Sequence, residues 1–262
     1  MELFVCIKQV PDDSVNVGLN ENGQPKLDGI TPVVNAFDTY ALEMAARFKE
    51  AHGGSVTVLS VGDVDALTPS MRGCLAVGAD RAYVVSESAK SDASGTAYLL
   101  SKGLAKSGEA GFDVIFCGSE STDFGEMQVG VLLAQQLGLP VVTNVLELEP
   151  AEGGLVVKQE TEDGYRIIET PCPCVLTVVK PGYEPRYPSI KSKMAARKMP
   201  VTGLTKTDIE ADTAFFGPEA VKVQRMMIAE PPQRQSGLKI QEKEAGVAVE
   251  RAMQLLIEQK LV

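Results

Sequence analysis

Short apolar runs and stretches of helical periodicity alternate along the first part of the chain. The apolar runs are typical of buried strands, and they cover residues 3–7, 55–61, 81–85, 113–117 and 141 onward. Helical spacing of the apolar residues occupies the stretches between them, from Asp38 to Gly53 and in 68–77, 96–106 and 130–137. Strands that alternate with helices in this way predict an α/β fold with a doubly wound, mostly parallel sheet. Such sheets carry their ligand sites at the carboxyl ends of the strands.

Three segments depart from this alternation. Residues 14–34 alternate weakly around an Asn-Glu-Asn-Gly turn, which predicts a hairpin outside the main sheet. Two apolar runs at 155–158 and 165–169 flank an Asp-Gly turn and predict an antiparallel hairpin, followed by one more core strand at 174–179. From Lys180 the chain is rich in Pro, Lys, Arg and Met, and we expect it to be irregular until an amphipathic helix at 245–260. A long irregular arm of this kind is typical of a segment that wraps a partner.

Composition and charge exclude several classes of protein. No apolar stretch approaches the roughly 20 residues that a membrane span requires, and the first residues read as a strand instead of a signal peptide. We therefore expect a cytoplasmic protein without membrane insertion. The net charge of −10 argues against nucleic-acid binding. The single histidine, His52, stands at a predicted helix end, so neither a catalytic triad nor a zinc site can be assembled, and no metal is expected.

The cysteines predict free thiols in a reducing compartment. There are five of them, an odd number, without the spacing of a zinc site or of a C-x-x-C redox pair. Cys6 and Cys117 lie within predicted buried strands, where a thiol behaves as a small apolar group.

Candidate chemistry lies directly after the predicted strand 113–117. Small and hydroxylated residues lead from Gly118 into the next helix, and the backbone N–H groups at a helix start are a usual place for a phosphate. Gly118 and Gly125 let the backbone approach a ligand closely. A well-capped helix after a tight turn would have the same composition, and neither a G-x-G-x-x-G motif nor a P-loop lysine is present.

A second helix start, at Asn35 to Asp38, follows a neighbouring part of the predicted sheet. Loops after neighbouring strands converge where the strand order reverses, so both turns could line one adenine-nucleotide crevice. The alternative is two unrelated helix caps.

Five motifs occur in the order and spacing of a known family. They are Val5 to Asp12, Asn35 to Glu43, Ala76 to Arg81, Gly118 to Gly130 and Glu184 to Pro188. Together they cover nearly the whole chain, which resembles the electron-transfer flavoprotein β subunits. The resemblance implies a sheet of the adenine-nucleotide-binding type and a heterodimer whose α subunit holds most of an FAD. It implies that the β subunit buries AMP or, in electron-bifurcating members, a second FAD, and that the pair carries electrons between dehydrogenases and redox partners.

The resemblance also implies roles for individual residues around the nucleotide. Cys6 and Val61 flank the adenine, and four residues lie at the ribose, namely Asn35, Ala36, Phe37 and Asp38. The phosphate is wrapped by a continuous loop made of Gly118, Ser119, Glu120, Ser121, Thr122, Asp123, Phe124, Gly125, Glu126, Met127, Gln128 and Val129.

Other residues are implied to contact protein partners. Glu160 matches a residue that contacts the mobile FAD domain of the α subunit, and Ile190 stands in the place of a leucine that anchors client dehydrogenases. The remaining docking residues are Glu184, Pro185, Arg186, Tyr187, Lys191, Lys193 and Met194. We therefore expect a nucleotide-binding α/β domain at 1–183, a partner-recognition loop at 184–200, and at 201–262 an arm and helix that dock on the α subunit. A solvated basic loop is the alternative for the second of these.

Three positions bear on the type of electron carrier. Asp13 stands where non-bifurcating members carry a tyrosine, and its smaller size resembles the bifurcating type, which oxidises NADH with a second flavin. Glu126 stands where bifurcating members usually carry a threonine, and Phe124 replaces a smaller residue. AMP, FAD or an empty β site, bifurcation, the client dehydrogenase and the final acceptor all stay open. So does an adenine-nucleotide sensor of the same fold without a redox role.

Overall fold

The computed structural model describes residues 1–262 except 88–90, 109–110, 224–225, 231 and 233–235. The chain divides into two compact units. The first contains Met1–Val17 and Pro25–Met226, and the second contains Gly18–Gln24 and Met227–Val262.

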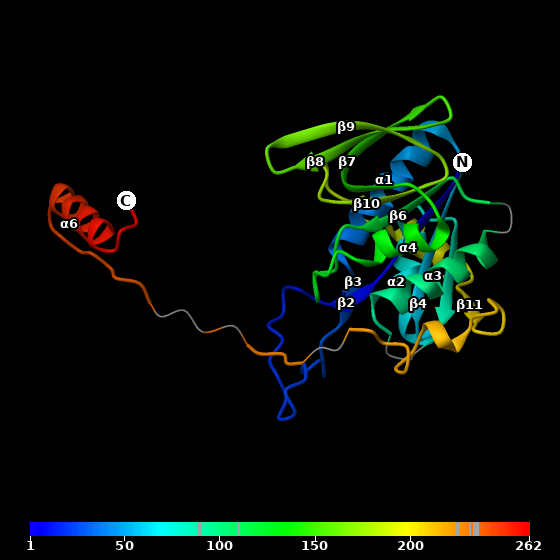
Figure 1. The fold of residues 1–262 in the computed structure, drawn as a ribbon, viewed down its shortest axis with the longest axis horizontal. Helices are drawn as coiled ribbons and strands as arrows, with labels where there is room; N and C mark the ends of the chain where they lie inside the picture. Colours follow the sequence, from blue (N-terminus) through cyan, green and yellow to red (C-terminus); the bar gives the residue numbers. More distant parts are fainter. Residues whose placement is uncertain (88–90, 109–110, 224–225, 231, 233–235) are drawn as a thin grey trace. The chain divides into compact units, whose positions relative to one another are not determined.

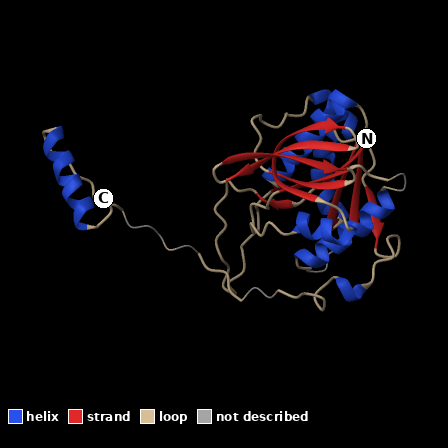
Figure 2. Cartoon of the chain, turned by 45° about the horizontal axis from the view of Figure 1, so that its top comes forward, coloured by secondary structure: helices blue, strands red, loops and turns tan. Residues whose placement is uncertain are grey.

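A nine-stranded sheet forms the centre of the first unit (Figures 1 and 2), with the strand order β11-β5-β4-β1-β6-β10-β7-β8-β9. The parallel strands are β1 (Glu2–Cys6), β4 (Ser55–Gly62), β5 (Arg81–Ser86), β6 (Val114–Gly118), β7 (Val141–Ala151), β10 (Cys174–Val178) and β11 (Thr202–Thr205). The antiparallel hairpin is β8 (Gly154–Thr161) and β9 (Gly164–Pro171), added beside β7. The predicted doubly wound, mostly parallel sheet with one hairpin is confirmed.

Helices cover both faces of the sheet. α1 (Ala36–His52) and α2 (Val64–Ala76) pack on one face, and α3 (Ala93–Ser107) and α4 (Val129–Leu137) pack on the other. The two cores follow from the strand period of two: Leu3 and Val5 of β1 face α1, whereas Phe4 and Cys6 face α3 and α4. Burial on both faces explains why the strands read as continuous apolar runs.

A second, two-stranded antiparallel sheet lies outside the main one, formed by β2 (Gln9–Pro11) and β3 (Pro32–Val34). The predicted excursion over 14–34 therefore exists, but its first pairing strand, β2, lies before residue 14, and only β3 belongs to the predicted segment. The turn that the sequence indicated is also present, because the Gly23 N–H donates to the Asn20 carbonyl at 2.9 Å.

The segment after Lys180 is more ordered than the sequence predicts. It contains α5 (Ile190–Ala196), β11 and a short 3-10 helix η1 (Thr213–Phe215). β11 pairs with β5 at the edge of the main sheet, and the first compact unit continues to Met226 instead of ending near residue 183. The sequence gives little sign of this strand, because only Leu204 of its four residues is buried.

One helix also begins earlier than predicted. α2 starts at Val64 and not at residue 68, because the Asp63 carboxylate accepts a hydrogen bond from the Ala66 N–H at 2.8 Å and caps the first turn.

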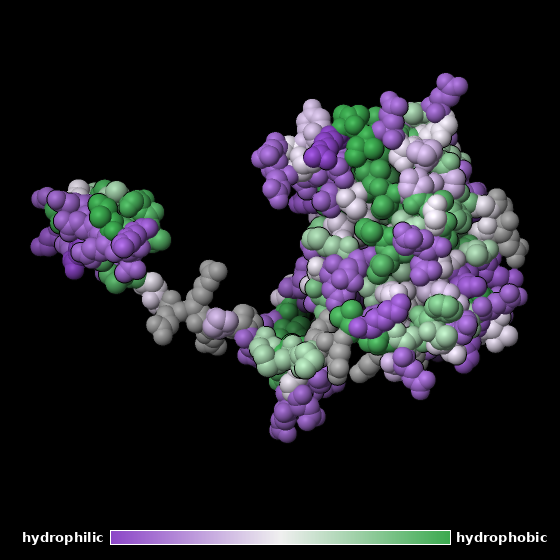
Figure 3. Space-filling view, in the orientation of Figure 1, coloured by the Kyte–Doolittle hydropathy of each residue, from purple (hydrophilic) through white to green (hydrophobic). Residues whose placement is uncertain are grey.

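The second unit contains α6 (Ala245–Glu258), close to the predicted helix at 245–260. Val249, Met253 and Ile257 follow one another at a spacing of four residues, and all three are exposed. Figure 3 shows the resulting apolar surface on this helix beside charged residues. None of the described helices combines the length and apolarity that crossing a membrane would need.

Candidate functional site

The carboxyl ends of β1 and β6 mark the point where the strand order reverses. From β1 the chain proceeds through α1 to β4 and then to β5 on one side, and it later returns to β6 on the other side of β1. In an open α/β sheet, the crevice outside such a reversal is the usual ligand site. The residues that the sequence assigned to a nucleotide converge there.

Asp38 ties the two strand ends to the start of α1. Its buried carboxylate accepts hydrogen bonds from the backbone N–H of Lys8 at 2.6 Å and from that of Gly118 at 3.1 Å. Burial raises the pKa of this carboxyl to about 7, although both hydrogen bonds act in the opposite direction. The carboxyl therefore organises the backbone of the crevice and does not face solvent.

Asn35 joins the two predicted helix starts. It occupies the N-cap position of α1 but makes no side-chain cap to that helix. Its amide nitrogen donates to the Glu120 carbonyl at 2.8 Å, and its amide oxygen accepts from the Thr122 N–H at 3.1 Å. The two segments thus form one structure, and the alternative of two unrelated caps does not describe it.

The loop of residues 119–128, here named the crevice loop, leaves β6 and leads into α4. The Ser119 N–H donates to the Val178 carbonyl at 2.9 Å, and the Gly125 N–H donates to the Ser121 carbonyl at 2.7 Å. Gly125 and Met127 have positive φ angles of 63° and 54°. The Gln128 side chain makes no cap at the start of α4, and the start of a helix is the end that favours an anion.

Lys8 holds this loop, a role that neither the sequence pattern nor the family resemblance indicated. Its Nζ donates to both carboxylate oxygens of Asp123, at 2.6 and 2.7 Å, and to the Ser121 hydroxyl at 3.2 Å. The same ammonium lies 4.8 Å from the centre of the Phe124 ring. The only signal in the sequence was a lysine placed just after a buried strand.

The hydrogen-bond donors of the crevice suit a nucleotide phosphate, but the negative charge of the crevice loop opposes one. A helix start and a lysine favour an anion, but Glu120, Asp123 and Glu126 bring negative charge to the same loop. Lys8 neutralises one of these carboxylates. Phe124 and Met127 are both more than half exposed, so the loop also offers apolar surface.

The cysteines of the site are free thiols, as predicted. Cys6 and Cys117, at the ends of β1 and β6, belong to the same buried cluster. The Cys6 thiol and burial together raise the pKa of the Cys117 thiol well above its ordinary value, so the end of β6 does not present a thiolate. Val61 lies near the end of β4, on the same side of the sheet as Cys6.

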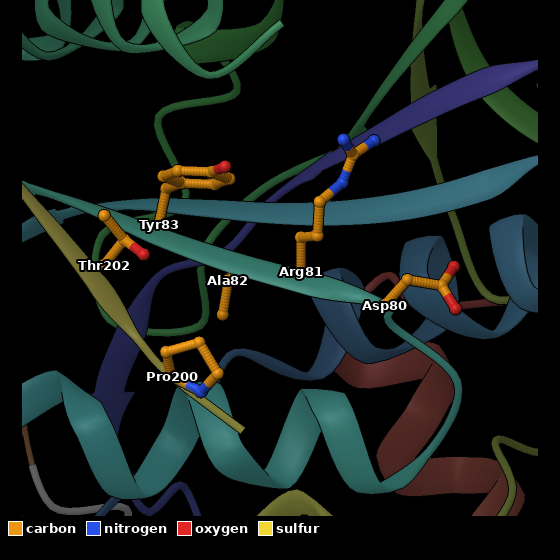
Figure 4. A pocket seen from close by; sticks show the side chains of 6 residues that line it. All are labelled: Asp80, Arg81, Ala82, Tyr83, Pro200 and Thr202. Atoms are coloured by element: carbon orange, nitrogen blue, oxygen red, sulfur yellow. The ribbon is translucent and has the colours of Figure 1, made fainter.

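A small cavity elsewhere in the first unit is not part of this site. It has a volume of about 90 Å³ and is lined by Asp80, Arg81, Ala82, Tyr83, Pro200 and Thr202 (Figure 4). These residues surround the starts of β5 and β11, at the end of the parallel sheet opposite to the crevice. Pockets for ligands of nucleotide size are usually about 300 Å³ or larger.

The predicted docking segment is fixed to α1 by Arg186. The Arg186 guanidinium donates to Glu43 at 2.8 and 3.1 Å and also pairs with Glu50, while its backbone N–H donates to Glu43 at 3.1 Å. Burial alone would raise the pKa of Glu43, but the hydrogen bonds from Arg186 and Arg47 outweigh it and lower that pKa. The Arg47 guanidinium stacks on the Tyr183 ring at 4.1 Å.

Beyond this anchor the segment exposes apolar side chains. Tyr187, Ile190 and Met194 are 95%, 81% and 61% exposed, and the last two are one helical turn apart on α5. Lys191 and Lys193 lie beside them and are also exposed. The predicted loop thus contains a short helix, which packs against α2 through the buried Ala196.

Glu160 lies on β8 at the solvent-facing side of the hairpin. It is exposed and pairs in register with Tyr165 of β9, whose ring lies 4.7 Å from the Lys158 ammonium. Glu184 forms an ion pair with Lys180 at 2.9 Å, and Pro185 follows it directly.

Comparison with known proteins gives this arrangement a context. A family model described as the electron transfer flavoprotein domain matches residues 28–209. The chain is 34% identical to the electron transfer flavoprotein subunit beta of Megasphaera elsdenii over 100% of each chain. It is 39% identical to the subunit of the same name from Thermoanaerobacterium thermosaccharolyticum over 83% of each chain. It is also 34% identical to subunit CarD of the caffeyl-CoA reductase-Etf complex of Acetobacterium woodii, over 90% of this chain and of CarD.

Proposed function

The chain belongs to the electron transfer flavoprotein family and has the role of its β subunit, and from this premise we propose that it pairs with an α subunit that holds most of an FAD. In this proposal the pair passes electrons from client dehydrogenases to redox partners in the cytoplasm. The flavin supplies the electron chemistry, and this chain supplies position, shielding and a docking surface.

The observation that carries the proposal is the joined crevice at β1 and β6. Asn35 links the start of α1 to the crevice loop, and Asp38 links the same helix to both strand ends. We propose that an adenine nucleotide binds there, with Cys6 and Val61 beside the base and the crevice loop around the phosphate. The sequence of the loop and its position at the start of α4 support a phosphate there.

Whether this nucleotide is AMP or a second FAD decides between two kinds of carrier. We propose AMP and a simple carrier as the first choice, because Glu126 and Phe124 add a carboxylate and bulk to the loop. The small Asp13 and the similarity to CarD support the alternative, a bifurcating subunit that works with NADH. A nucleotide sensor without flavin is a further alternative.

Two surfaces of the chain suit protein partners. We propose that the exposed apolar stripe of α6 docks on the α subunit, because an amphipathic helix with one uncovered face is normally buried against another protein. We propose that the surface of Tyr187, Ile190 and Met194, with its neighbouring lysines, docks on the client dehydrogenase. Glu160 on the hairpin is proposed to contact the FAD domain of the α subunit.

Counting the bound nucleotides tests the proposal directly. We expect the complex with the α subunit to release one FAD and one AMP per heterodimer when it is denatured and its nucleotides are separated. Two FAD and no AMP would favour the bifurcating alternative. A complex that contains an adenine nucleotide but no flavin would support the sensor instead.

Replacing Ile190 with alanine tests the docking surface. We expect the loss of this exposed side chain to weaken the complex with the client dehydrogenase about tenfold to hundredfold, corresponding to about 1–3 kcal/mol. The measurement is electron transfer from the reduced heterodimer as a function of dehydrogenase concentration. Leu27→Ala is the matched control, because Leu27 is 49% exposed and lies outside the docking segment. Equal half-saturation in the Ile190 variant and the unchanged protein would argue that the segment is a solvated loop.

A further inference from the structure

Lys8 connects β1, α1 and the crevice loop through a single residue. Its backbone N–H donates to the Asp38 carboxyl at 2.6 Å, and its ammonium reaches three successive parts of the loop, at Ser121, Asp123 and Phe124. Ser121 and Asp123 lie 113 and 115 residues further along the chain. Lys8, two residues after the end of β1, therefore joins this part of the chain to the loop that follows β6.

We propose that Lys8 is a positioning residue that, together with Asp123, closes the crevice loop for the phosphate of the bound nucleotide. The inference rests on the proposed nucleotide site and adds a residue pair to it. The Lys8–Asp123 ion pair holds the middle of the loop, while Asn35 holds the preceding residues through the Glu120 carbonyl and the Thr122 N–H. With both attachments in place, the loop N–H groups and the start of α4 keep one arrangement toward an anion.

The ion pair has a second effect, on charge. An unpaired Asp123 carboxylate in the loop would repel a phosphate, and the bidentate contact with Lys8 removes most of that repulsion. Lys8 could also serve by contacting the phosphate itself after releasing Asp123. The two roles predict opposite results for Asp123→Asn. If the Lys8–Asp123 ion pair closes the loop, this substitution weakens binding of the nucleotide. If Asp123 competes with the phosphate for Lys8, the substitution strengthens it.

The experiment measures AMP and adenosine binding to the heterodimer after its nucleotide has been removed. AMP is the probe because it is common to both proposed nucleotides, and adenosine reports the base and ribose contacts without the phosphate. We expect Lys8→Met and Asp123→Asn each to weaken AMP binding by at least about tenfold while adenosine binding changes by less than about threefold. The double variant should be no weaker than the weaker single variant, because both remove the same contact. Lys8→Arg should retain most of the affinity for AMP.

Two controls make the result specific. Lys206→Met removes one positive charge from an exposed position just after β11 and should leave AMP binding unchanged. Thermal unfolding of each variant separates a loss of binding from a loss of the fold, since an unfolded variant would lose adenosine as well as AMP.

Three outcomes would overturn the inference. Tighter AMP binding by Asp123→Asn would mean that Lys8 contacts the phosphate itself. Additive losses of AMP affinity in the double variant would mean that the two residues act separately. Unchanged AMP binding in both single variants would mean that the ion pair has no role in nucleotide binding. If the unmodified heterodimer bound neither AMP nor adenosine, the proposed nucleotide site would be wrong, and so would the inference about loop closure.

Discussion

Gly118→Ala is expected to abolish nucleotide retention and to lower the free energy of unfolding by about 3 kcal/mol, the upper end of what overpacking costs. A Cβ at this position would overlap the Asp38 carboxylate and would lie 2.8 Å from the Phe37 Cβ and 2.9 Å from the Phe37 carbonyl carbon. The obstacle is therefore the first turn of α1 and not the ligand. To admit the methyl group, α1 must move away from β6, which separates the two halves of the crevice.

The measurement combines thermal unfolding of the heterodimer with its content of released nucleotide. Gly73→Ala is the matched control, since a Cβ on this exposed residue of α2 would meet nothing within 4 Å. Alanine there should stabilise the helix by up to about 1 kcal/mol, because glycine is the poorer helix former. A Gly118→Ala protein that unfolds normally and keeps its nucleotide would show that the contact between α1 and β6 is not required.

Asp38→Ala is expected to have the second large effect, a loss of about 2–6 kcal/mol in the free energy of unfolding. The substitution leaves the N–H groups of Lys8 and Gly118 without their acceptor at the buried end of the crevice, and each unsatisfied group costs about 1–3 kcal/mol. Nucleotide retention should fall with it, because the same two bonds bring β1, β6 and α1 together. Urea unfolding of the heterodimer at pH 5 measures the change in the free energy of unfolding.

The pH dependence of stability tests the state of this carboxyl. Its pKa is raised to about 7 in the folded chain against 3.8 for the ordinary side chain. Between about pH 4 and pH 7 the folded chain keeps a proton that the unfolded chain has lost, so this group makes stability fall as pH rises, by up to about 1.4 kcal/mol per pH unit. The contribution is complete below about pH 4 and absent above about pH 7. Glu43, Glu50 and Asp92 have lowered pKa values, and their effect, lost as pH falls, belongs to the region below about pH 4.5.

Asp38→Asn isolates this effect. The amide cannot ionise, so the unchanged protein should lose stability relative to the variant as pH rises from 5 to 7.5. A constant difference over that range would mean that the Asp38 carboxyl is already ionised at pH 5 in the folded protein.

The order of strands and helices could be predicted because both faces of the sheet are covered. Burial on both sides produces continuous apolar runs, and residues such as Leu3 and Phe4 identify the first strand although they face opposite cores. The hairpin of β8 and β9 was predictable for a local reason, the Asp-Gly turn between two alternating runs. The crevice loop was predictable from its composition, since small and hydroxylated residues are unusual directly after a buried strand.

The contacts that join distant segments could not be predicted in this way. Arg186 and Glu43 are 143 residues apart, and nothing in either neighbourhood identifies the other as a partner. β11 depends on β5 for its pairing, and its own residues alternate too briefly to mark a strand. The role of Lys8 could not be predicted for the same reason, because its loop partners follow only after the chain has passed through five more strands and three helices.

The chain between β10 and β11 leaves the main sheet and returns to it, so the proposed docking surface of Tyr187, Ile190 and Met194 lies on a closed loop and not on a tail. Arg186 shortens the free part of this loop further by fixing it to α1. Most of the conformational entropy of this surface is therefore lost when the subunit folds. Little conformational entropy remains to be lost when a partner binds. A small apolar surface prepared in this way can associate at rates limited by encounter and orientation instead of by folding on the partner. It can also release quickly, which the proposed role as a carrier between client dehydrogenases requires.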